Sequence, residues 1–312
     1  MIEEYEAAAA KGPRIWAIGG GKGGVGKSVI ATNLGASLAA SGARVVLVDA
    51  DLGGANLHTL LGVATPPTNL SDFVARRVKK LADVAIPTTV DNLRLVSGAK
   101  ALLEMANPNY GQKGKILRHI SALDADHVII DLGAGSAFNV LDFFLIARRG
   151  ILVVVPEATS VENAYHFLKA AYFRKLKRAQ PRPQIRSAIQ QVMAEVSPQD
   201  LRTPRDLVAR VMAVDHDAGA ALVAEASTFN PSLIVNCAEH AEHQRLGNDM
   251  STACLDYFGI RLECLGTLPA DRLVARSVSR RSPAAVLYRR SPFVNAMRSI
   301  AERLASPNWR PS

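Results

Sequence analysis

The sequence predicts an α/β fold, a doubly wound, mostly parallel sheet with helices on both faces. Two observations lead to this prediction. Short apolar runs that end in glycine or an acid recur at residues 15–18, 45–48, 93–96, 128–130, 151–155, 233–235 and 262–268. Helix-length stretches separate them, including residues 28–41, 160–177, 244–257 and 292–304. Continuous apolar runs are typical of strands buried on both faces, and their alternation with helices is typical of a parallel sheet.

The composition is that of a globular protein with a substantial core. The chain has 312 residues, 48 % of them hydrophobic, and a formal net charge of +9. This charge favours an acidic partner, such as nucleotide, DNA or an anionic membrane surface, without choosing among them. The three cysteines, Cys237, Cys254 and Cys264, form neither a disulfide framework nor a CxxC metal motif. Because there is no signal-peptide pattern and no apolar run long enough to span a bilayer, we expect a cytoplasmic protein.

We expect one domain over residues 14–305, preceded by an extension at 1–13 and followed by a tail at 306–312. Residues 178–229 interrupt the alternation of strands and helices in this domain, with several prolines and two helical patterns at 204–214 and 218–226. Thr203 followed by Pro204 is typical of a helix start. We interpret this segment as a helical insertion on the sheet, because it is too short and too polar for a core of its own.

A glycine-rich segment follows the first predicted strand. Residues 21–28 match the phosphate-loop pattern GxxxxGK[ST], and a helical pattern comes directly after them. Glycines let the backbone turn its N–H groups inward, where they and a helix N-terminus bind phosphate oxygens. The P-loop residues expected to bind nucleotide are Gly21, Lys22, Gly23, Gly24, Val25, Gly26, Lys27, Ser28 and Val29. Lys27 is expected to contact the β and γ phosphates, and the Ser28 hydroxyl to ligate Mg²⁺.

The segment KGGVGKS, from Lys22 to Ser28, resembles the deviant Walker A box of the MinD/ParA family of ATPases. In that family a second lysine stands near the start of the loop, and Lys22 occupies this place. The resemblance implies ATP and Mg²⁺ as ligands and an ATP-dependent homodimer in which Lys22 reaches the partner's phosphates, as an arginine finger does. Val29 departs from the pattern, since many relatives carry a hydroxyl residue there, but its backbone N–H can still donate.

Two strand ends carry acids in the family's arrangement. Residues 49–56 are similar to its DxDxGxxN switch, and residues 128–135 have the form of a Walker B strand with a glycine-containing switch. Such strand ends meet at the ligand edge of an open sheet. The resemblance implies that Asp51 orients or deprotonates the attacking water and helps to hold Mg²⁺, and that Asp131 accepts from a Mg²⁺-bound water. The expected catalytic residues are thus Lys22, Lys27 and Asp51, and the expected metal residues are Ser28, Asp51 and Asp131.

Two later strand ends resemble the family's adenine pocket. An amide can read both the donor and the acceptor of adenine, so Asn236 is the expected reader. Pro269 is expected to pack near the base. Pro156 and Glu157 resemble a segment near the family's dimer interface, without an assigned contact.

The resemblance implies a Mg²⁺-dependent ATPase that acts as a slow dimerisation switch, controlling the placement or number of a structure such as flagella or the division site. Within the family, residues 49–56 and 281–292 most resemble the flagellar-number regulators, the FlhG/FleN branch. A protein activator or cargo is implied but not identified. One alternative is a ParA-like partitioning ATPase that holds nonspecific DNA through its basic surfaces. Another is an assembly or carrier scaffold, whose paired cysteines are missing from residues 133–141. Direct membrane binding is not expected, because the amphipathic stretch at 292–304 has the spacing of a helix packed on its own sheet.

Overall fold

The computed structural model describes residues 12–51, 53–64, 66–98, 110–147, 149–179, 183–195 and 203–306. Most of the expected N-terminal extension and tail, and parts of the expected insertion, lie outside the described residues.

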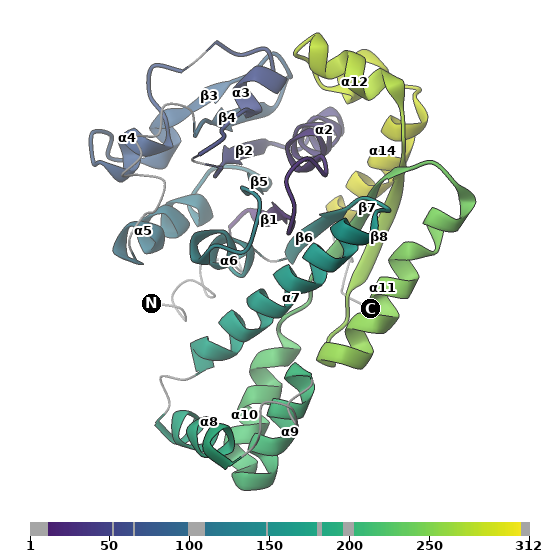
Figure 1. The fold of residues 1–312 in the computed structure, drawn as a ribbon. Coiled ribbons are helices and arrows are strands. Elements are labelled where there is room, and N and C mark those ends of the chain that lie inside the picture. The colour runs from purple at the N-terminus through teal and green to yellow at the C-terminus, as the bar shows by residue number, and fades with distance from the viewer. Residues whose placement is uncertain are drawn as a thin grey trace.

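The described residues form an eight-stranded sheet in the order β3-β4-β2-β5-β1-β6-β7-β8 (Figure 1). Its strands are β1 (Arg14–Gly19), β2 (Val45–Asp49), β3 (Ala85–Pro87), β4 (Leu93–Val96), β5 (His127–Asp131), β6 (Arg149–Val154), β7 (Ser232–Ala238) and β8 (Glu263–Pro269). Every neighbouring pair is parallel except β3 and β4. The predicted doubly wound, mostly parallel fold is therefore confirmed. The short edge strand β3 was not predicted, and it ends in a proline, which an edge tolerates.

The helices fill the intervals between the strands. They are α2 (Lys27–Ala40), α3 (Leu57–Leu60), α4 (Leu70–Val74), α5 (Tyr110–Ser121), α6 (Phe138–Phe144), α7 (Ala158–Ala179), α8 (Pro183–Glu195), α9 (Pro204–Val214), α10 (His216–Ser227), α11 (Leu246–Phe258), α12 (Arg272–Ser279), α13 (Ala284–Leu287) and α14 (Pro292–Ala305), with the 3-10 turns η1 (Leu81–Val84) and η3 (Ala241–Gln244). The helices predicted by range are α2, α7, α9, α10, α11 and α14. Among the described residues, none of these helices combines the length and apolar character that crossing a bilayer requires.

Apolar side chains pack against both faces of the sheet. One buried cluster joins the sheet to α5, α6, α7 and α11, and the other joins it to α2 and α14. Phe293, Met297, Ile300 and Leu304 of α14 are all buried in the second cluster, as their spacing predicted. The central strands β1, β2, β5, β6 and β7 are thus covered from two sides, which explains why they read as continuous apolar runs.

Helices α8, α9 and α10 gather at one end of α7, away from the phosphate loop (Figure 1). The Thr203 hydroxyl accepts from the backbone N–H of Asp206 at 3.1 Å, so α9 begins with the predicted cap. Val211 and Leu222 of this group belong to the same apolar cluster as the sheet, so its core is continuous with that of the sheet.

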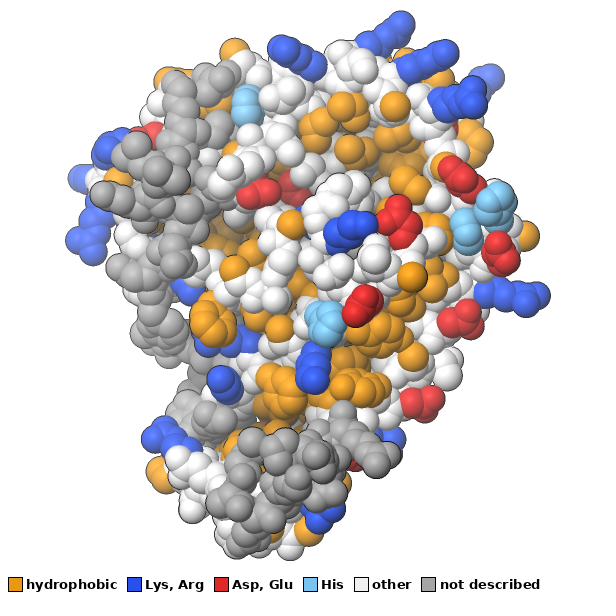
Figure 2. Space-filling view, in the orientation of Figure 1, with side chains coloured by type: hydrophobic (Ala, Val, Ile, Leu, Met, Phe, Trp, Pro, Cys, Tyr) orange, Lys and Arg blue, Asp and Glu red, His pale blue; other side chains and the backbone are white. Residues whose placement is uncertain are grey.

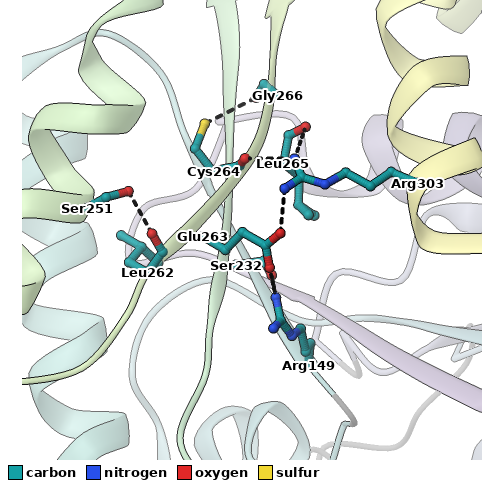
Figure 3. A network of polar contacts seen from close by, with 9 residues as sticks. All are labelled: Arg149, Ser232, Ser251, Leu262, Glu263, Cys264, Leu265, Gly266 and Arg303. Atoms are coloured by element: carbon teal, nitrogen blue, oxygen red, sulfur yellow. Dashed lines mark hydrogen bonds and ion pairs between the residues drawn. The ribbon is translucent and has the colours of Figure 1, made fainter. Parts of the chain in front are cut away.

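A polar network fastens the far edge of the sheet (Figure 3). The guanidinium of Arg149 on β6 binds the carboxylate of Glu263 on β8 and donates to the Ser232 hydroxyl on β7. Arg303 of α14 binds the same carboxylate from the other side. Three strands and the last helix are therefore joined around one partly buried acid.

Candidate phosphate-binding site

The loop between β1 and α2 has the backbone shape that its glycines allow. Gly24 and Gly26 have φ angles of 81° and 94°, in the left-handed region that favours glycine. Gly26 is the N-cap of α2, and its carbonyl accepts from Ile30 N at 2.9 Å. The first N–H groups of α2 are therefore directed into the loop, which is the arrangement that binds phosphate oxygens.

The loop is held between two neighbouring segments. A Cβ atom on Gly21 would lie 2.0 Å from the carbonyl oxygen of Asn163, so the backbone of α7 packs directly on this glycine. On the other side, the N–H of Gly135 donates to Gly20 O at 3.2 Å. The segment after β5 therefore rests on the loop.

A residue near the end of β7 supports the loop through a hydrogen bond. The buried amide of Asn236 donates from Nδ2 to the carbonyl oxygen of Val25 at 2.9 Å. A Cβ atom on Gly26 would lie 2.5 Å from the same nitrogen, so only glycine fits beside the amide. The structure thus brings Asn236 to the loop; its reading of adenine stays a prediction.

The two lysines of the loop are placed differently. Lys27 is buried, and its Nζ donates to the carbonyl oxygen of Lys22 at 3.3 Å. Burial lowers the pKa of Lys27, while the charges of Asp131 and Asp51 oppose this shift. The Lys22 side chain is 41 % exposed, with its Nζ 3.0 Å from Glu157 Oε2. It also donates to the Thr159 hydroxyl at 3.2 Å.

Two buried acids stand side by side at the ends of β2 and β5, because Asp49 and Asp131 are register partners. Asp131 accepts from the Ser28 hydroxyl, and Asp49 accepts from Leu57 N at 3.1 Å through Oδ2. Burial raises the pKa of each carboxyl to about 7. The Oδ1 atom of each has no hydrogen-bond partner. Buried, unsatisfied carboxylate oxygens beside a serine hydroxyl suit Mg²⁺, which prefers hard oxygen ligands and retains water.

Asp51 belongs to the first switch segment and lies close to the second. Its Oδ1 accepts from Gly54 N at 3.1 Å. A Cβ atom on Gly133 would lie 3.1 Å from the same oxygen, so the segment after β5 passes close by. Asp51 also faces Lys27 closely enough to influence its pKa.

The structure therefore gathers Gly21 to Val29, Asp51, Asp131 and Asn236 at one edge of the sheet, where their sequence positions predicted them. Pro269 ends β8 opposite Ala238 of β7, and its packing near the base stays a prediction. Sequence reasoning did not assign roles to Asp49, Glu157 or Thr159. For Asp49 a signal existed, since it precedes Asp51 by two residues. Within the described ranges no group of three His, Cys, Asp or Glu residues could hold a metal ion by itself.

The chain resembles known proteins over the half that contains the phosphate loop, Asp51 and Asp131. A family model described as ParA, NUBPL iron-transfer P-loop NTPase, matches residues 13–170. The antiactivator FleN of Pseudomonas aeruginosa is 36 % identical over 158 residues, which cover 50 % of this chain and 55 % of FleN. The flagellum site-determining protein YlxH of Helicobacter pylori is 30 % identical over 162 residues, covering 49 % of this chain and 52 % of YlxH. The chain spans about half the length of the curated relatives it matches.

The similarity of fold extends over nearly the whole chain. The septum site-determining protein MinD of Pyrococcus horikoshii, solved with Mg-ADP, superposes with a TM-score of 0.64 and 22 % identity. The superposition covers 94 % of this chain and 96 % of that one. At this identity the match concerns the fold.

Proposed function

The chain belongs to the ParA family of P-loop NTPases, whose model matches residues 13–170, and from this premise we propose that it is an ATP-dependent dimerisation switch. ATP and Mg²⁺ bind at the loop between β1 and α2, two copies close face to face, and slow hydrolysis releases them. The proposed output is control of the placement or number of a cellular structure, such as flagella or the division site. This output is supported by the roles named for similar proteins: the antiactivator FleN, the flagellum site-determining protein YlxH and the septum site-determining protein MinD.

One observation carries the proposal: of the two lysines in the phosphate loop, one is buried in the site and the other lies at the protein surface. Lys27 is only 8 % exposed and faces the acids of the site, while Lys22 stands at the surface, held by a half-exposed ion pair. A surface lysine beside a phosphate cradle can leave a weak local partner and stabilise charge on a nucleotide bound by a second copy.

The chain's own groups divide the remaining work. The loop N–H groups and Lys27 orient the phosphates, and Asp51 is positioned to orient the attacking water. Ser28 and Asp131 would hold Mg²⁺, with Asp51 nearby. Bound there, the ion would supply charge neutralisation for the phosphates.

Light scattering with ATP and Mg²⁺ tests the proposal. Wild-type protein is expected to gain scattering with ATP but not with ADP, and Lys22→Ala to remove the gain. Asp51→Ala is expected to prolong the gain and to slow phosphate release by at least about a hundredfold. Lys169→Ala serves as the matched control and should behave as wild type, because Lys169 is an exposed lysine on α7, outside the phosphate loop. If neither Lys22→Ala nor Asp51→Ala alters dimerisation or turnover, the mechanism is wrong.

We also propose a binding surface for a partner protein beside the Lys22–Glu157 ion pair. A cavity of about 530 Å³ lies between the starts of α7 and α11 and includes Glu157 on its wall. Val161, Tyr165 and Leu246 form its apolar lining, and Glu162, Glu242 and Asp249 add acids to its rim. The unidentified activator or cargo would meet Lys22's ion-pair partner here.

A DNA-binding role is the second candidate, because one surface favours it. Residues 272–301 contain seven arginines and no Asp or Glu. Basic side chains gather along the edge of the molecule over α12 (Figure 2). A second basic stretch lies at residues 174–178. There, by contrast, Arg174 and Lys175 are paired with Asp142 and Glu225. Retention on nonspecific DNA that is lost at high salt, and lost with Arg276→Glu but not with Arg210→Glu, would support this role.

The carrier alternative finds less support. Paired cysteines would have to lie near the loop after β5, and residues 133–141 contain none. Of the three cysteines, Cys254 is buried, and Cys237 and Cys264 lie on different strands. An iron-loading assay on the purified chain is expected to find no bound cluster.

A further inference from the structure

The cavity between the starts of α7 and α11 combines an apolar lining with an acidic rim. Its volume of about 530 Å³ is within the range of roughly 300–1,000 Å³ that is typical of ligand cavities. The described residues that line it include four acids and no lysine or arginine: Glu157, Glu162, Glu242 and Asp249 are the acids. Figure 2 shows a band of apolar side chains between α7 and α11, with acidic side chains along its borders.

Most of the negative charge of this rim is uncompensated. Within the described part of the chain, Glu242 and Asp249 have no ion-pair partner. His166 lies 3.8 Å from Glu162, in a pair whose side chains are 69 % and 71 % exposed, so water screens it. His243 of the lining adds no positive charge, because its Nδ1 accepts from a backbone N–H at 3.2 Å. The cavity is therefore acidic in a chain whose formal net charge is +9.

The rim and the lining together select the chemistry of an occupant. A nucleic acid or an anionic membrane carries charge of the same sign as the rim, so it is repelled. A divalent cation alone would leave the apolar lining uncovered, and within the described ranges no group of three His, Cys, Asp or Glu residues could hold one. A peptide segment with both basic and apolar side chains matches the rim and covers Val161, Tyr165 and Leu246, which are only half-buried without it.

The two ends of this chain do not supply such a segment. Residues 1–10 contain three glutamates and no lysine or arginine, so their charge has the sign of the rim. At the other end, the carbonyl oxygen of Ser306 accepts from Arg14 Nη1 at 3.2 Å, at the start of β1. The cavity lies at the opposite edge of the sheet, beside the ends of β6 and β7. The occupant is therefore a segment of another protein.

Glu157 belongs both to the rim and to the ion pair with Lys22, whose Nζ lies 3.0 Å from Glu157 Oε2. We propose that the cavity binds a cationic, amphipathic segment of a partner protein, and that a basic side chain of this segment takes Glu157 from Lys22. The released Lys22 is then free for the second copy. The proposal rests on the proposed function, because the dimer described there is what the partner promotes. By linkage, the dimer binds the segment more tightly by the same factor.

The binding half of the proposal is tested without nucleotide, by calorimetry on the full-length chain. The probe is a synthetic amphipathic peptide of leucine and arginine, compared with a peptide of leucine and glutamate and with spermine, which has charge but no apolar side chains. Only the first should bind. The double variant Glu242→Gln, Asp249→Asn is expected to weaken it at least about fivefold. The double variant Asp256→Asn, Glu302→Gln removes the same charge from exposed positions elsewhere on α11 and α14, so it should bind as wild type.

The coupling half is tested by sedimentation velocity with Mg²⁺ and a non-hydrolysable ATP analogue. The leucine–arginine peptide is expected to tighten the wild-type dimer up to about fivefold, because the lysine loses an exposed ion pair. It should not tighten the dimer of Glu157→Gln, in which Lys22 is already released. ADP affinity should be the same for all variants, since none of them alters a residue that binds phosphate.

Four results would overturn the proposal and leave the proposed function standing. The peptide fails to bind; it binds both double variants equally; spermine binds as tightly as the peptide; or the peptide binds and leaves the wild-type dimer unchanged. A dimer that forms without nucleotide and is weakened by Glu242→Gln, Asp249→Asn would instead make a second copy the occupant. A wild-type chain that stays monomeric with the ATP analogue would overturn the proposed function, and the coupling with it.

Discussion

The Nζ atom of Lys22 lies 3.0 Å from Oε2 of Glu157, in an ion pair that joins the phosphate loop to the start of α7. The two side chains are 41 % and 59 % exposed, so water screens the pair and its contribution to stability is small. The contact nevertheless decides where the lysine points in a single copy. In the proposed dimer, a second copy would have to compete with Glu157 for the lysine.

Glu157→Gln is expected to tighten the ATP-dependent dimer up to about fivefold, because the lysine no longer has to leave a charged partner. The free energy of unfolding should change by less than about 1 kcal/mol. The monomer–dimer Kd from sedimentation and a urea titration measure the two effects. A weaker dimer would contradict this expectation and would place Glu157 in the contact itself.

Asn236→Ala is expected to lower ADP affinity about tenfold and stability by about 1–3 kcal/mol, because the buried carbonyl of Val25 loses its donor. Asn236→Asp should be worse, since a carboxylate would face that carbonyl. Calorimetry with ADP and GDP separates two roles for the amide. If Asn236 reads adenine, the alanine variant loses its preference for ADP over GDP; if it only braces the loop, both affinities fall together.

The local parts of this site follow from sequence, and the contacts between them do not. The glycines from Gly21 to Gly26 predict a tight loop from the local sequence alone. Asp51 and Asp131 are predicted as site residues because they stand at or just after the ends of apolar strands. By contrast, Asn236 and Val25 are 211 positions apart, and Lys22 and Glu157 are 135 apart. These pairs meet because β6 and β7 follow β1 in the sheet, an order that no local pattern specifies.

The same limit applies to Asp49. Its position beside Asp131 follows from the register of β2 and β5, and the hydrogen bond from Leu57 N brings the start of α3 against it. In the sequence, Asp49 and Asp51 are two similar acids, and only the structure separates a buried one from a half-buried one. The edge strand β3 escaped prediction because three residues are too few to display an alternating pattern.

Glu263→Gln is expected to destabilise the fold by about 3–5 kcal/mol, because it removes the carboxylate that the buried Arg149 guanidinium binds (Figure 3). Arg303→Met should cost less, since Arg303 is 40 % exposed and Glu263 would keep Arg149. Urea titrations of the two variants compare the costs. Equal costs would show that the network acts through Arg303 and not through the buried pair.

His127 should make the fold sensitive to acid. Trp16 Nε1 donates to its Nδ1 at 3.1 Å, and burial lowers its pKa to about 4. In the unfolded chain this histidine binds a proton near pH 6.5. The contribution of neutral His127 to the free energy of unfolding is therefore fully present above that pH and is lost as pH falls toward 4. His127→Gln, which retains an acceptor for Trp16, should remove up to roughly 3 kcal/mol of this loss. Unfolding free energies at several pH values should therefore converge for wild type and variant near pH 4; parallel curves would contradict the assignment.

Asp49 should act with the opposite sign over nearly the same range. Its folded pKa is raised to about 7, whereas an unfolded aspartate titrates near 3.8. Its favourable contribution is therefore complete below the unfolded value and is lost as pH rises through about 7, where a charge becomes buried. Asp49→Asn retains an acceptor for Leu57 N and cannot ionise. Its stability relative to wild type should rise by on the order of 1–3 kcal/mol between pH 4 and pH 8, in nucleotide-free buffer without Mg²⁺. A difference that stays constant with pH would mean that Asp49 is charged in the folded chain throughout, so that the desolvation argument fails for this acid.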